Sequence, residues 1–106
     1  MSEYNAIVKS HDIEMSEDGQ HITFWMELEL PHSGGVGFVM TSPTTKEGNS
    51  SFTHDLNMVL NVLGVNKLSE IDGRPLVAVF DREMFLGSKL IGIKHFLDKC
   101  SFMEEK

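Results

Sequence analysis

The side chains in this chain that could in principle bind a metal ion are histidines and several acidic residues, and one cysteine could in principle act as a nucleophile. The histidines number five: His11, His21, His32, His54 and His95. No two of them have the i, i+4 spacing of a metal-binding helix, and Cys100 is the single cysteine, so no cysteine pair completes a zinc site. Cys100 also lacks the flanking signature of a catalytic thiol. We therefore expect surface histidines, no metal site and no catalytic residue.

A cluster of glycines over residues 34–37 suggests a phosphate-binding loop at first sight. The cluster lacks a following helix and the glycine spacing of the phosphate-binding and dinucleotide-binding motifs. A turn and a bulge at the start of a strand explain it better. Because no other cofactor loop stands out in the chain, we expect no cofactor.

Trp25 is the candidate for contact with a nucleic-acid base. It lies within an alternating segment and points away from the face that Ile22, Met26 and Leu28 build. An outward aromatic ring on a barrel strand can stack a base, which contributes ~1–3 kcal/mol per base. The alternative is that the helix, a loop or a partner subunit covers Trp25.

Basic side chains could supply the phosphate contacts of the same interface. Four of them fall on and around the last two expected strands: Arg74, Arg82, Lys89 and Lys94. If these strands are neighbours, the four side chains form a modest basic strip. Their acidic sequence neighbours are Asp72, Asp81 and Glu83. Ordinary surface ion pairing with these neighbours is the alternative interpretation.

The excess of acidic residues supports a different hypothesis. The formal net charge is −7, and residues 1–33 contain seven of the sixteen acidic side chains but one of the nine basic ones. An acidic chain is at a disadvantage in binding phosphates, although a negative charge also simply keeps a small protein soluble. Acidic side chains can instead occupy the basic cleft of a partner, as in an inhibitor or a DNA mimic. The candidates for this role are Glu14, Glu17, Asp18, Glu27 and Glu29.

The elements that position these residues begin with a strand over His21–Leu30. Apolar and polar residues alternate there without a break, which is the period of a half-buried strand. Residues 4–15 predict the preceding strand, with a change of phase near Ser10 that indicates a bulge. Residues 16–20 predict the turn of a hairpin between the two strands.

The rest of the chain predicts further strands and one helix. The helix has apolar residues at the 3.6-residue period and ends at Gly64. In chain order we expect a strand over 36–40, a polar loop over 41–51, the helix over 56–63, a short helical turn over 66–71, a strand over 76–80, a connection over 81–88 and a strand over 89–96.

The order β-β-β-α-β-β predicts a mostly β fold with one main helix, arranged as a small OB-like five-stranded barrel. The 106 residues fit a single domain, 1–106, with a flexible tail over 99–106. Residues 1–10 have no secretion signal and no apolar run approaches the ~20 residues of a membrane span, so we expect a cytoplasmic protein without membrane contact. Unpaired strand edges could pair between subunits, so the sequence also allows a homo-oligomer.

Several segments resemble those of short phage- and prophage-encoded proteins that look like single-stranded-DNA-binding OB domains. The most telling passage covers residues 63–79, where a helix is followed by Gly-Val, a short turn, Gly73-Arg74 and a strand. The resemblance also includes residues 4–8, His21–Leu30, 56–63 and 91–93. It implies a phage-type accessory protein in the host cytoplasm that contacts single-stranded nucleic acid or the replication and recombination proteins that handle it.

Two functions follow as expectations. The first is a non-catalytic OB-like protein that binds single-stranded nucleic acid, or a protein that handles it, through Trp25 and the basic strip. The second is an acidic protein that binds a basic partner protein. Loss of single-stranded DNA binding on Trp25→Ala would support the first, whereas salt-sensitive association with a basic protein would support the second.

Overall fold

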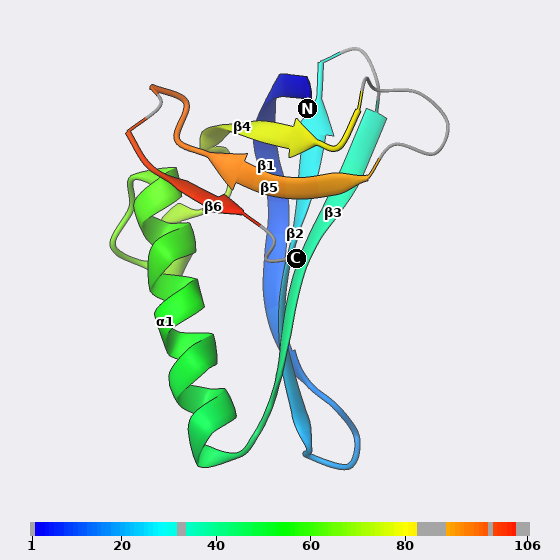
Figure 1. Ribbon diagram of the computed structural model, residues 1–106, viewed down its shortest axis with the longest axis vertical. Coiled ribbons are helices and arrows are strands. Elements are labelled where there is room, and N and C mark those ends of the chain that lie inside the picture. The colour runs from blue at the N-terminus through cyan, green and yellow to red at the C-terminus, as the bar shows by residue number, and fades with distance from the viewer. Residues whose placement is uncertain (1, 32–33, 83–88, 98, 104–106) are drawn as a thin grey trace.

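One antiparallel sheet and one main helix make up the described part of the chain. The computed structural model describes residues 2–31, 34–82, 89–97 and 99–103. Its elements are β1 (Ser2–Met15), β2 (His21–Leu30), β3 (Gly34–Pro43), α1 (Lys46–Leu63), the 3-10 helix η1 (Leu68–Glu70), β4 (Pro75–Phe80), β5 (Leu90–Lys94) and β6 (Ser101–Met103). The strand order in the sheet is β3-β2-β1-β4-β5-β6 (Figure 1). The mostly β class with one main helix is confirmed.

The number of strands and the closure of the sheet differ from the expectation. The sheet has six strands rather than five, because Ser101–Met103 pairs with β5 within the segment that we expected to be a tail. Among the described residues no pairing joins β3 to β5 or β6, so the sheet is open rather than a closed barrel. Since β6 takes the edge of β5 that a closing strand would use, β3 keeps an open edge.

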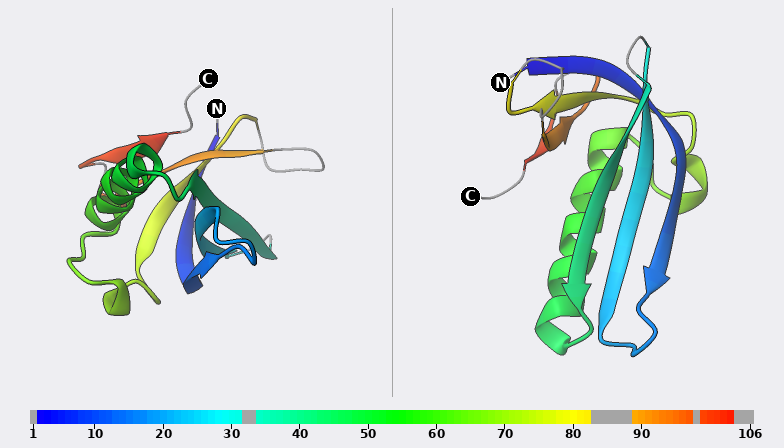
Figure 2. Two further views of the ribbon diagram at one scale, coloured as in Figure 1. Left: turned by 90° about the horizontal axis from the view of Figure 1, so that it is seen from below. Right: turned by 90° about the vertical axis from the view of Figure 1, so that its right-hand side faces the viewer.

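β1 pairs with two different strands, and this divides the sheet into two parts. Its first half pairs with β4 and its second half with β2, and the register shifts between Val8 and Ser10, which confirms the predicted bulge. At this point the Val8 N–H donates to the Arg74 carbonyl at 3.0 Å, and the Gly73 N–H donates to the Val8 carbonyl at 2.7 Å. The part containing β4, β5 and β6 therefore crosses over one end of the long β1-β2-β3 part (Figure 2).

The helix begins earlier than its apolar pattern indicates. Thr45 caps it, and its side-chain oxygen accepts the Gly48 N–H at 3.0 Å, so the first turn starts at Lys46. Because β3 also continues to Pro43, the loop expected over residues 41–51 shrinks to two residues. No helix within the described ranges is long and apolar enough to cross a membrane. Residues 46–55, which precede the predicted start, form the first turns of α1, and Gly48 among them lies against Pro43 at the end of β3.

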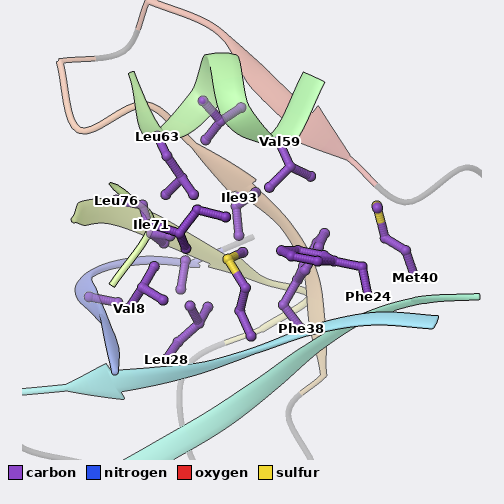
Figure 3. Packing of buried hydrophobic residues seen from close by; sticks show 14 of the residues in the cluster. Val8, Phe24, Leu28, Phe38, Met40, Val59, Leu63, Ile71, Leu76 and Ile93 are labelled. Atoms are coloured by element: carbon purple, nitrogen blue, oxygen red, sulfur yellow. The ribbon is translucent and has the colours of Figure 1, made fainter. Parts of the chain in front are cut away.

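The core lies between the helix and the inner faces of both parts of the sheet. Phe24, Met26 and Leu28 of β2 are fully buried, as the alternation predicts. In Figure 3, Val59 and Leu63 of α1 face the side chains of the sheet across this core. The connection over residues 81–88 and His32 lie largely or wholly outside the described residues.

We predict that Gly48→Ala destabilises the protein although alanine normally favours a helix over glycine by ~1 kcal/mol. Gly48 is buried, and a Cβ there would collide with the carbonyl of Pro43. The free energy of unfolding, measured by urea denaturation, should fall by about 1–3 kcal/mol. The matched variant Asn57→Ala, at an exposed position of the same helix, should leave it unchanged or raise it slightly. Equal stability of Gly48→Ala and the unmodified protein would contradict the close contact between α1 and Pro43.

Candidate binding surfaces of the sheet

Trp25 lies on the face of the β1-β2-β3 part that points away from the core. Its neighbours in the strand, Phe24 and Met26, are fully buried on the opposite face. In the ladder Trp25 stands between Asp12 of β1 and Val39 of β3. The indole is partly buried, whereas Val39 is 63% exposed. Trp25 and Val39 therefore form an apolar centre on this face, and the exposed Ile7 lies further along it.

Carboxylates surround this apolar centre. Glu14 is paired with Thr23, Glu27 with Ser10, and Glu29 with Ile7, so all three share the face of Trp25. Lys9 is the only lysine or arginine in β1, β2 and β3, and its Nζ lies 3.9 Å from a carboxylate oxygen of Glu27. We call this surface the acidic outer face, defined by Asp12, Glu14, Trp25, Glu27 and Glu29.

The turn between β1 and β2 extends the acidic outer face and is tightly organised. The Asp18 carboxylate accepts the Ser16 hydroxyl at 2.6 Å and the Gln20 N–H at 3.0 Å. These bonds, that from Ser16 first, hold the pKa of Asp18 below its ordinary value. The Thr44 hydroxyl donates to the Gly19 carbonyl at 2.6 Å and ties the turn to the start of the helix. Asp18 thus shapes the turn, and Glu17 is an exposed carboxylate beside it.

Arg74 is engaged at the end of the helix. The helix stops at Gly64, which has the left-handed φ of 70° that the sequence predicts there. The Arg74 Nε donates to the Leu63 carbonyl at 3.1 Å, and its Nη2 donates to the Gly64 carbonyl at 3.4 Å. A cation at this end also interacts favourably with the helix dipole. The guanidinium therefore stabilises the helix terminus.

The other three basic candidates lie on or beside β4 and β5. Lys94 forms an ion pair with Glu3 at 3.0 Å. Lys89 and Asp81 close the base of the connection, since the Lys89 N–H donates to the Asp81 carboxylate at 2.8 Å and the Asp81 N–H donates to the Lys89 carbonyl at 2.9 Å. The Lys89 N–H also holds the pKa of Asp81 below its ordinary value. Arg82 is exposed beside this closure.

The structure thus separates the members of the nucleic-acid hypothesis and gathers those of the acidic one. Trp25 sits among carboxylates on β2, while Arg74 is at the end of α1 and Lys94 is paired across β4. Three of the five acidic candidates share the outer face, and the other two lie in the adjoining turn. Charge therefore favours the acidic face as an interaction surface.

A second surface, which the sequence did not indicate, opens between β3 and the end of the sheet. It is a cleft of about 950 Å³ bounded by β3, α1, β5 and β6. Its lining includes Phe38, Met40, Asp55, Met58, Leu90 and Phe102. We call it the edge cleft. The helix residues that line it precede the predicted helix start or lie near it, so the apolar pattern could not place them beside β3.

The groups considered for metal binding and thiol chemistry remain dispersed. Within the described ranges no three histidine, cysteine or acidic side chains gather into a possible metal site, and Cys100 is exposed. His11 contacts Asp72 at 2.7 Å and links β1 to the segment before β4. His95 is buried, and its Nδ1 accepts the Leu97 N–H at 2.9 Å. Both histidines therefore make structural contacts.

We predict that Ser16→Ala raises the pKa of Asp18 toward its ordinary value, because the variant removes the main hydrogen bond to the carboxylate. A folded-state pKa below the unfolded one stabilises the protein above the unfolded pKa, and this stabilisation is lost as pH falls through the folded pKa. The melting temperature of Ser16→Ala should therefore fall below that of the unmodified protein at neutral pH and converge with it in acid. Carboxyl NMR titration measures the pKa, with Glu17→Gln as control. An unchanged Asp18 pKa in Ser16→Ala would contradict this role.

The sequence of this chain was compared with protein-family models and with curated proteins. No protein-family model matches the chain, and no curated protein matches its sequence. What the surfaces bind has therefore to be argued from their residues.

Proposed function

We propose that this protein is a non-catalytic, cytoplasmic binding domain whose acidic outer face engages a basic partner protein. The placement of Glu14, Glu27 and Glu29 on one face, beside Glu17 and Asp18, carries this proposal. Like charges held on neighbouring strands repel one another, which costs some folding stability. The cations of a basic partner would attract these carboxylates and offset the repulsion among them.

The centre of the same face supplies an apolar anchor, which the carboxylates alone do not provide. Energetically dominant contacts in protein interfaces are commonly buried aromatic side chains surrounded by polar residues. Trp25, with the exposed Val39 beside it, is such an apolar centre, and Asp12 and Glu27 lie around it. The carboxylates would accelerate and orient the encounter, and the indole would anchor the complex.

The proposal includes an OB-like arrangement of the strands, with the sheet open between β3 and β5. β1 is shared by both parts of the sheet, and the helix connects β3 to β4, as in an OB-fold. The edge cleft lies where β3 would meet β5 in a closed barrel. Together with the resemblance to phage and prophage proteins, this supports a phage-type accessory factor that acts on proteins of replication or recombination.

Single-stranded nucleic acid is the second candidate ligand, and the outward position of Trp25 favours it. A base could stack on the partly buried indole. The phosphates of such a ligand would approach Asp12, Glu27 and Glu29, and they would meet Lys9 as the single cation of these strands. This repulsion is why the basic protein is the preferred ligand.

We predict that the fluorescence of Trp25, the single tryptophan, responds to deca-arginine at low salt and responds less at physiological salt. Oligo-dT should leave the signal unchanged, because phosphates meet the carboxylates of this face. Titration of the fluorescence with each probe measures both affinities. Saturable quenching by oligo-dT that weakens with salt would instead assign the face to single-stranded DNA.

A pair of charge reversals provides the control. Glu29→Lys on the outer face and Glu70→Lys in η1 change the net charge equally. Glu29→Lys should weaken deca-arginine binding about tenfold, and Glu70→Lys by less than about twofold. Equal effects of the two variants would show that only the overall charge matters and would contradict a defined acidic site.

A further inference from the structure

We propose that the open edge of β3 binds an extended peptide segment of a partner, in which apolar and basic residues alternate, as an additional strand in the edge cleft. This site goes beyond the acidic outer face, because it uses the backbone of β3 and the cleft beside it. Addition of a strand to a sheet edge is a recurrent mode of peptide recognition, in which main-chain hydrogen bonds supply affinity.

The backbone of β3 has donors and acceptors directed toward this edge. The Thr44 N–H donates to the Gln20 carbonyl at 2.9 Å, which sets the phase of the antiparallel ladder between β2 and β3. Because hydrogen-bonded and non-hydrogen-bonded pairs alternate, Gly37 and Val39 direct their N–H and C=O groups away from β2. The contact between the Thr23 and Thr41 hydroxyls at 3.0 Å fits a non-hydrogen-bonded pair, in which side chains lie closest.

β3 has none of the charged side chains that commonly protect an exposed edge. Proteins block exposed edges with lysines, prolines or inward-pointing charges. β3 has ten residues without a charged one, and its single proline is the last residue. Within the described ranges no strand covers its outer edge. An edge of this length without such protection is suited to accept a strand.

The two faces of β3 specify the side chains of the added strand. On the core side, inward side chains would meet Phe38 and Met40 of β3, Met58 of α1 and Phe102 of β6. The rings of Phe38 and Phe102 lie edge to face at 5.8 Å, and flexible methionines accept apolar side chains of different shapes. Every second residue of the segment is therefore apolar.

Outward side chains of the added strand would lie two strands away from Glu27 and Glu29 of β2. Neighbouring strands are about 4.8 Å apart, so this separation is about 10 Å, near one Debye length. The remaining positions of the segment are therefore basic. A second copy of β3 fits less well, because it would bring its own Glu27 and Glu29 toward the same face.

The test uses the octapeptide KVKVKVKV, labelled with fluorescein, and two substitutions at one position. A Cβ at Gly37 would meet no atom within 4 Å, so alanine has room there. Proline is compatible with an edge strand where the N–H of the residue points away from the sheet. Gly37→Pro removes an N–H directed to the open edge, whereas Gly37→Ala retains it. Fluorescence anisotropy should show binding that Gly37→Pro weakens at least about tenfold and Gly37→Ala by less than about twofold.

Two further measurements keep the test decisive if Gly37→Pro unfolds. A peptide with N-methylated lysines should bind at least about tenfold more weakly than KVKVKVKV to the unmodified protein, because in an antiparallel added strand the lysines opposite Gly37 and Val39 carry the N–H groups directed to β3. Amide NMR shifts on binding should concentrate in residues 35–41 and 54–58. Equal binding of both peptides, shifts confined to the acidic outer face, displacement by oligo-dT from residues 35–41, or a dimer that Gly37→Pro abolishes would each overturn the proposal.

The outcomes separate this site from the acidic outer face. Deca-arginine quenching of Trp25 should be the same in Gly37→Pro and Gly37→Ala if the two sites are distinct. Peptide binding that is insensitive to Gly37→Pro, together with a deca-arginine response that is sensitive to Glu29→Lys, would overturn the edge site and leave the acidic face standing. The reverse pattern would support the edge site and contradict the acidic face.

Discussion

The structure depends on how β1 changes partners at Val8. On one side Val8 belongs to the ladder with β2, and on the other its backbone exchanges hydrogen bonds with Gly73 and Arg74 just before β4. The bulge between Val8 and Ser10 adds the bend that lets one strand serve two differently oriented parts of the sheet. The helix then packs between those parts, and its end is held by Arg74 from the same segment. Moving this pivot would displace both the core and the edge cleft.

Alternation along β2 separates the core from the acidic face without any additional element. Met26 and Leu28 are fully buried, while Trp25 and Glu27 leave the strand on the opposite side. A shift of one residue in register would bury carboxylates, which carries a large desolvation penalty. The charges on the outer face therefore strengthen the register that buries the core, at the cost of repulsion among themselves. A binding face and a folding constraint reside in the same ten residues.

Local signals in the sequence predicted the elements that local physics determines. The alternation of His21–Leu30, the bulge near Ser10 and the stop at Gly64 were all correct, because each depends on a few adjacent residues. The start of α1 was wrong because its first turns are polar and depend on the Thr45 cap. β6 was missed because three residues carry too little pattern, and their pairing with β5 decides their structure.

The candidate sites also divide into those that local sequence patterns determine and those that tertiary packing determines. Alternation placed Trp25, Glu27 and Glu29 on one face, since side-chain direction within a strand is a local property. The role of Arg74 was missed because its partners, the carbonyls of Leu63 and Gly64, meet it only through tertiary packing. The edge cleft could not be predicted from the sequence for the same reason, because segments that are distant in the chain form it. Sequence patterns therefore predict faces better than clefts.

β3 connects the two proposed binding surfaces. Its Val39 lies beside Trp25 on the outer face, and its backbone forms the open edge a few ångströms away. A segment paired with that edge would also cover part of Val39 and continue the outer face by one strand. A partner that holds both surfaces would then bind the second one at the high effective concentration set by the first. Two weak contacts, one made by carboxylates that salt screens and one made by backbone hydrogen bonds, would combine into a single interface whose affinity falls only partly as salt rises.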